Sequence, residues 1–117
     1  MADLDQLMNL AGAEAAFTMS SRGELKESKI VEGSRINKTA LDLLAHMCIA
    51  NMSIATMQAR GWETQSDAQG FYPIEGFTLV GMDWSAVTNG QVGVILNNNV
   101  ADYEAANAAL AAAGGAA

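Results

Sequence analysis

The side chains best suited to covalent chemistry in this sequence are its single histidine, His46, and its single cysteine, Cys48. A thiol enzyme needs a base within hydrogen-bond reach of the sulfur. In a helix, however, side chains two positions apart point in directions that differ by about 160°. His46 and Cys48 therefore cannot form a catalytic dyad within one subunit, and we expect Cys48 to be a small buried apolar residue.

Metal and phosphate sites are not indicated either. The sequence has no pair of histidines and no Cys-x-x-Cys, and its carboxylates are scattered. Met47, Met52 and Met57 repeat every five residues, which spreads them around a helix instead of gathering them at a metal. The glycine-containing segment 76–81 lacks the Lys-Ser/Thr that a phosphate loop requires. We predict no metal, no cofactor, no catalytic residue and no enzymatic activity.

The charge pattern limits the class of partner. The net charge is −7, five of the six basic residues lie between positions 22 and 38, and residues 61–117 carry six acids and no base. Nucleic-acid binding depends on clustered Lys and Arg, so an acidic chain of this kind is not expected to bind it. The basic segment in an acidic body instead favours a protein partner, or a second copy of the chain, with complementary charge.

The length of 117 residues fits one domain, which we place at residues 1–113 and follow with a disordered Ala/Gly tail at 114–117. A single cysteine excludes an intrachain disulfide, and the first residues show neither a basic leader nor an apolar run. We therefore expect a cytoplasmic protein. Polar residues interrupt the longest apolar stretch, 39–59, so no membrane span is predicted there.

Hydrophobic periodicity and turn signals predict eight elements in the order α-β-β-α-β-β-β-α. Asp3 or Asp5 can cap the first helix, Gly23 marks a hairpin turn, Asn89-Gly90 marks another turn, and Asn98 or Asn99 can cap the last helix. Gly61 is expected to end the long central helix. The predicted helices are up to residue 10, 39–60 and 101–113, and the predicted strands are 15–19, 24–31, 71–74, 76–82 and 91–96.

The long helix at 39–60 has more apolar surface than one sheet can cover. Its polar residues gather in a narrow stripe made of Asp42, His46, Ser53, Thr56 and Arg60. Apolar residues line both sides of this stripe, whereas a surface helix of a monomer needs only one buried face. One apolar flank can pack on the sheet of its own chain, and the other needs a further partner.

The order of elements resembles the roadblock (dynein light chain) domain, a profilin-like α/β sandwich. The resemblance covers nearly the whole chain and is carried by the turn Ser21-Arg22-Gly23-Glu24, the helix segment 41–45 and the final strand at 93–96. It is strongest to a small bacterial branch of unknown function, and the chain departs from better-known members at residues 62–70 and 84–87. The resemblance implies a central, mostly antiparallel five-stranded sheet with helices on both faces.

The same resemblance implies a homodimer in which the long helices pack side by side and the sheets extend one another. Roadblock dimers are scaffolds or regulators, and some engage Ras-like GTPases across the paired helices. We therefore predict a non-enzymatic interaction module whose partner-binding residues are those of the polar stripe. Its dimer interface is predicted at one flank of the long helix, Leu43, Met47, Ala50, Ile54 and Met57, or at the opposite flank.

A small-molecule sensor is the alternative function. Related profilin-like sandwiches bind ligands beside their sheets, and this chain has four aromatic residues between positions 71 and 84 that could line a pocket. These residues are Phe71, Tyr72, Phe77 and Trp84.

Overall fold

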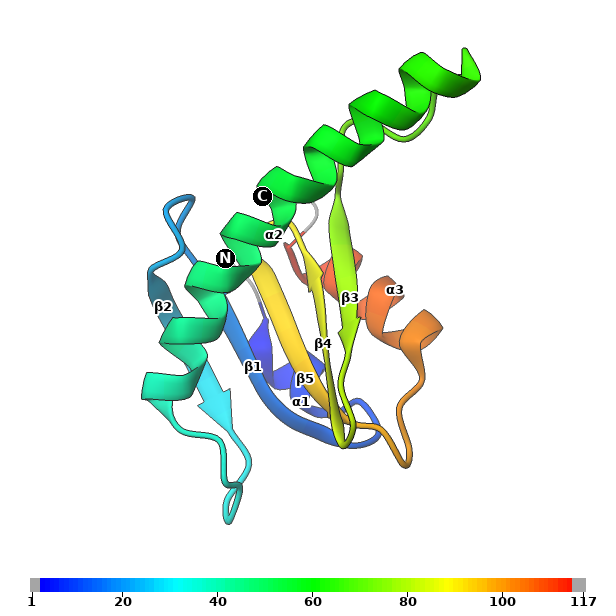
Figure 1. The fold of residues 1–117 in the computed structure, drawn as a ribbon. Coiled ribbons are helices and arrows are strands. Elements are labelled where there is room, and N and C mark those ends of the chain that lie inside the picture. The colour runs from blue at the N-terminus through cyan, green and yellow to red at the C-terminus, as the bar shows by residue number, and fades with distance from the viewer. Residues whose placement is uncertain (1–2, 115–117) are drawn as a thin grey trace.

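A computed structural model describes residues 3–114 and shows one five-stranded sheet between two layers of helices (Figure 1). The order of elements is the one predicted from the sequence. The elements are α1 (Leu4–Met8), β1 (Ala13–Met19), β2 (Leu25–Ile30), α2 (Lys38–Ser66), β3 (Gly76–Val80), β4 (Trp84–Asn89), β5 (Val92–Asn97) and α3 (Tyr103–Gly114).

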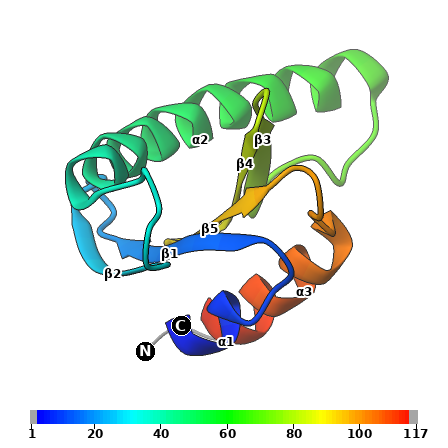
Figure 2. The ribbon, with the colours of Figure 1, turned by 90° about the horizontal axis from the view of Figure 1, so that it is seen from below.

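The sheet has the strand order β2-β1-β5-β4-β3, and every neighbouring pair is antiparallel. Helix α2 lies across one face of this sheet, and α1 and α3 cover the other face (Figure 2). The predicted fold class, a five-stranded antiparallel sheet with helices on both faces, is confirmed. The first and last strands of the order, β2 and β3, are the two edges of the sheet.

Each face of the sheet has its own hydrophobic core. On the side of α1 and α3, Leu7 and Leu110 pack with alternate residues of the strands, among them Val87 and Val94. On the side of α2, Leu41, Ala45 and Cys48 pack against residues that include Phe17 and Ile95. Residues of the two cores alternate along the central strands, because successive side chains of a strand point to opposite faces of the sheet.

The helix starts depend on short polar caps. The Asp3 carboxylate accepts a hydrogen bond from the Gln6 amide at 3.3 Å, and the Asn37 side chain accepts one from the Ala40 amide at 2.9 Å. The Asp102 carboxylate accepts a hydrogen bond from the Ala105 amide at 3.0 Å and caps α3. The prediction that Asn98 or Asn99 caps this helix was therefore wrong. The Asn98 side chain instead holds the β3–β4 turn and the buried Ser85 hydroxyl.

The largest error of the sequence prediction lies in residues 61–75. Helix α2 does not end at Gly61 but continues to Ser66, where Asp67 adopts the left-handed conformation with φ of 54°. Gly61 has open space around it and stays helical, because one glycine lowers helix stability by only about 1 kcal/mol relative to Ala. The segment that follows, 67–75, is a connection without strand structure.

The strand predicted at 71–74 is wrong, and the region at 84–87 that the sequence left without an element belongs to β4. The Phe71 and Tyr72 amides donate to a side chain of α2, and Pro73 has no amide hydrogen, so this segment cannot join the ladder. The Asn89-Gly90 turn joins β4 to β5. Gly114 is the last residue of α3, and the rest of the predicted tail, 115–117, lies outside the described residues.

Candidate interaction surface

One flank of α2 carries large apolar side chains that its own subunit leaves uncovered. Leu43 is 63% exposed, Ile54 56% and Met57 74%, and Met47 and Ala50 are also exposed. We call these five residues the apolar flank. The opposite side of the helix, with Leu41, Ala45, Cys48 and Ala59, is buried. The structure therefore identifies the flank that lacks a partner, and its role as a dimer interface stays a prediction.

The spacing of the apolar flank is that of a helix-pairing seam. Its members follow one another at intervals of four, three, four and three residues, which is the heptad pattern of two helices packed along their length.

Only 17% of the most apolar 18-residue stretch of α2 is buried, and by length and composition this helix could also cross a membrane. The polar stripe along the helix argues for protein contact instead.

The polar stripe faces the β1–β2 hairpin at its N-terminal end. The Asp42 carboxylate accepts a hydrogen bond from the Leu25 amide at 3.1 Å, which joins α2 to the start of β2. The His46 ring nitrogen Nδ1 lies 2.7 Å from the Asp42 carbonyl oxygen and 3.9 Å from the carboxylate. Both side chains remain about half exposed. Asp42 therefore has a structural role in addition to any role in partner binding.

The rest of the stripe is also engaged within the subunit. The Ser53 hydroxyl donates to the Ile49 carbonyl at 3.3 Å, and the Thr56 hydroxyl donates to the Met52 carbonyl at 2.8 Å, both one turn back along the helix. Arg60 places its guanidinium 4.3 Å from the centre of the Tyr72 ring. The structure thus brings the predicted partner-binding residues onto one side of α2, and partner binding itself stays a prediction.

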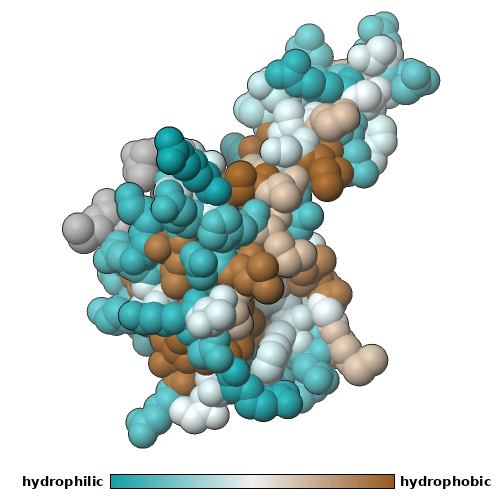
Figure 3. All heavy atoms as spheres, turned by 60° about the vertical axis from the view of Figure 1, so that its left-hand side comes forward, coloured by the Kyte–Doolittle hydropathy of each residue, from teal (hydrophilic) through white to brown (hydrophobic). Residues whose placement is uncertain are grey.

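The C-terminal end of α2 projects beyond the sheet, and the chain returns from it to β3 (Figure 1). We call residues 60–72 the aromatic arm. The rings of Trp62 and Phe71 meet edge to face with centroids 5.4 Å apart, and Arg60 stacks on Tyr72. All three rings remain about half exposed. Figure 3 shows apolar surface continuing from the body onto this projecting part.

Glu63 fastens the returning chain to the helix. Its carboxylate oxygen Oε2 accepts the amides of Gly70, Phe71 and Tyr72 at 2.9, 3.1 and 3.2 Å. The Tyr72 and Gly70 amides make the largest contributions to lowering the pKa of Glu63 below its usual value, because they favour the charged carboxylate. Glu63 is not among the residues predicted from the sequence, since nothing in its spacing indicates that the chain folds back onto it.

An apolar groove of about 220 Å³ runs between the first half of α2 and the β3–β4 end of the sheet. Its lining includes Ala40 and Leu44 from the helix and Leu79 and Trp84 from the strands. At its edge the Arg35 guanidinium lies 5.0 Å from the centre of the Trp84 ring. The groove opens beside the apolar flank, because Ala40 and Leu44 lie between that flank and the buried side of α2.

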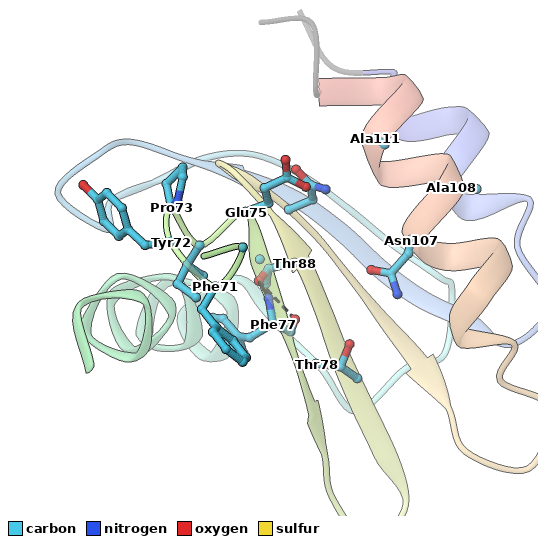
Figure 4. A pocket seen from close by; sticks show the side chains of 14 residues that line it. Phe71, Tyr72, Pro73, Glu75, Phe77, Thr78, Thr88, Asn107, Ala108 and Ala111 are labelled. Atoms are coloured by element: carbon cyan, nitrogen blue, oxygen red, sulfur yellow. Dashed lines mark hydrogen bonds between the residues drawn. The ribbon is translucent and has the colours of Figure 1, made fainter. Parts of the chain in front are cut away.

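A second, more polar pocket of about 870 Å³ lies between the 70–76 connection, the start of β3 and α3 (Figure 4). Phe71, Tyr72 and Phe77 line it, together with Asn107 from α3. Trp84 lines the apolar groove instead. The expectation of one pocket lined by all four aromatic residues was therefore wrong, and a small-molecule function stays a prediction.

Two observations describe the reactive groups among residues 3–114. Cys48 is buried, and burial raises the pKa of its thiol to about 11, so the reactive thiolate is disfavoured. Within residues 3–114, no three His, Cys, Asp or Glu side chains come close enough to hold a metal ion.

The sequence of residues 3–112 matches the family described as "Uncharacterized conserved protein (DUF2173)". The chain belongs to this family. No sequence among the curated proteins matches it.

Solved structures show the same fold at low sequence identity. The chain superimposes on a roadblock/LC7 domain from Streptomyces avermitilis with a TM-score of 0.72 and 12% identity, covering 95% of this chain and 91% of that one. It superimposes on the gliding protein MglB from Thermus thermophilus with a TM-score of 0.71 and 14% identity, covering 97% and 87%. A structure of MglB with a tetrameric arrangement gives 0.67 and 15%, again covering 97% and 87%. The DUF2173 chain therefore has the roadblock fold.

Proposed function

We propose that this protein is a non-enzymatic, homodimeric interaction module of the cytoplasm. The observation that carries the proposal is the apolar flank of α2, whose large side chains are more than half exposed in a single subunit. Exposed apolar patches of this kind mark sites of association. Self-association is supported by the roadblock fold, since a structurally similar MglB was solved in a tetrameric arrangement.

The edge of the sheet next to the groove supports the same arrangement. Strand β3 is an edge strand, and its Leu79 and Val80 side chains are exposed. An uncovered edge strand is a template for pairing with another chain. The roadblock resemblance implies that this edge pairs with the β3 edge of a second copy and extends one sheet into the other.

The proposed task of the dimer is to present its doubled polar stripe to another protein. The two copies together carry about twice the charge of one chain, which is −7. This favours a partner with a basic patch and disfavours nucleic acid. A Ras-like GTPase is the partner class that the roadblock resemblance suggests.

The mass in solution tests the dimer. We expect light scattering at micromolar concentration to give about twice the 12.2 kDa of one chain. Ile54→Asp should return the protein to the monomer mass, because it places a charge in the centre of an apolar contact. Val100→Asp is the matched control, since Val100 is 55% exposed, like Ile54, and lies between β5 and α3, outside both the apolar flank and the β3 edge. A wild-type protein that stays at 12.2 kDa would show that the proposed dimer is wrong.

A further inference from the structure

Helix α2 leaves one end of the sheet uncovered. It crosses the sheet at an angle, and the part of β3 and β4 next to their connecting turn does not lie beneath it (Figure 1). Leu79 of β3 is consequently 49% exposed, and the apolar groove of about 220 Å³ lies between this part of the sheet and the first half of α2. Concave apolar surface with few polar groups is the usual setting of a ligand site.

The walls of the groove hold an occupant by apolar contact. They consist of aliphatic residues together with Gly81, Trp84 and Ser85. The Ser85 hydroxyl is already bonded to Asn98 and to Tyr103 of α3, the helix on the other face of the sheet. An apolar molecule in the groove therefore displaces water without leaving this buried hydroxyl unpaired.

The size of the groove fits a slender molecule. Its volume of about 220 Å³ lies below the range of roughly 300–1,000 Å³ that is typical of sites for drug-sized ligands. A water molecule takes about 30 Å³ of liquid volume, and a methylene group is of similar size. An alkyl chain of about seven carbons would therefore fill the groove.

A cation without an acidic partner stands at the edge of the groove. The Arg35 guanidinium lies 5.0 Å from the centre of the Trp84 ring, which forms part of the wall. The chain has 13 acids and only six Lys and Arg, yet no carboxylate within residues 3–114 forms an ion pair with Arg35. A guanidinium matches the geometry of a carboxylate, with which it can form two parallel hydrogen bonds. The charge at the edge therefore favours an anionic head group on an apolar occupant.

We propose that the apolar groove binds a medium-chain fatty acid of about eight carbons, with its alkyl chain between Leu44 and Leu79 and its carboxylate on the Arg35 guanidinium. The inference goes beyond the proposed interaction module and does not depend on the homodimer. Around α2, Leu44 points about 120° away from Ala50 of the apolar flank, so a helix paired at that flank leaves the groove open.

A series of ligands tests the chemistry of the occupant. In titration calorimetry with hexanoate, heptanoate and octanoate, we expect the affinity to rise about fourfold for each methylene and to level off once the groove is full. Octanol should bind about three- to tenfold more weakly than octanoate, because it lacks the charge that pairs with Arg35. Octylamine should bind more weakly still. Absence of octanoate binding, or octylamine binding as tightly as octanoate, would overturn the proposal.

A pair of charge variants tests the position of the carboxylate. Arg35→Gln should weaken octanoate binding about three- to tenfold and leave octanol binding unchanged. Lys26→Gln is the matched control, because it removes one exposed positive charge from the same basic segment at a position that does not line the groove. It should leave the binding of both ligands unchanged. Equal losses in the two variants would show attraction to the basic segment as a whole and overturn the contact with Arg35.

A pair of tryptophan variants tests the position of the alkyl chain. Ala40 is exposed on α2 and lines the groove, so Ala40→Trp should fill it and abolish the binding of octanoate and octanol alike. Ala105→Trp is the matched control, at an exposed position of α3 on the other face of the sheet, and should bind both ligands as the wild type does. Octanoate binding that persists in Ala40→Trp, or is lost in both variants, would show that the groove is not the site.

Discussion

A single carboxylate determines the shape of the aromatic arm. Glu63 is exposed enough to stay charged, yet it accepts three amide hydrogen bonds that would otherwise go to water or to a neighbouring strand. These bonds explain why residues 70–72 follow the helix and do not extend the sheet. No residue spacing in the sequence could predict this, because the bonds span seven to nine residues of an irregular connection.

The arm should respond to acid through Glu63. The pKa of this carboxyl is lowered in the folded protein, so its stabilising effect is present above the ordinary value of 4.5 and is lost as the pH falls through the lower folded value. In NMR titrations from about pH 6 to about pH 2.5, we expect the amide shifts of Gly70, Phe71 and Tyr72 to move together. Glu63→Gln should abolish this movement, and Glu75→Gln, on the same connection, should preserve it. Unchanged amide shifts in the wild type would contradict the assignment.

Elements with strong periodicity were predictable, and elements defined by distant contacts were not. The hairpin around Gly23 and the body of α2 follow from local pattern, and the exposed flank follows from the excess of apolar positions on that helix. Strand β4 was missed because its Ser85 and Thr88 make it look polar, although both are buried. The continuation of α2 past Gly61 was missed because the residue that stops it, Asp67, adopts a conformation usually left to glycine.

The contact between the β1–β2 hairpin and α2 should be sensitive to one added methyl group. Gly23 has φ of 93°, and a Cβ there would lie 2.8 Å from the His46 Cα. Gly33 has φ of 85° but open space around it. We expect Gly33→Ala to lower the free energy of unfolding by about 1 kcal/mol through backbone strain. Gly23→Ala should lower it by about 2–4 kcal/mol, because overpacking adds to that strain. Equal losses in denaturant titrations would show that the hairpin does not pack closely on α2.

At the scale of the whole molecule, α2 carries more apolar surface than its own subunit covers. The sequence alone indicated that α2 has one flank too many, and the structure shows which flank it is, with Ile54 near its middle. The sequence could not indicate the projecting arm or the groove. Both arise from where α2 crosses the sheet, which is set by the packing of Leu41, Ala45 and Cys48.

If the subunits are stabilised by pairing, thermal stability must depend on protein concentration. A hundredfold increase in concentration favours the folded dimer over two unfolded chains by about 2.7 kcal/mol. For a unit of this size, that corresponds to a rise in Tm of about 5–10 °C. We expect this rise in calorimetry of the wild type between about 5 and about 500 µM, a range that spans the hundredfold change. The Ile54→Asp monomer should melt at one temperature throughout, because both of its states are single chains. A wild-type Tm that is equally independent of concentration would mean that the apolar flank stays uncovered in the folded state, and that the subunit is stable without the contact proposed for it.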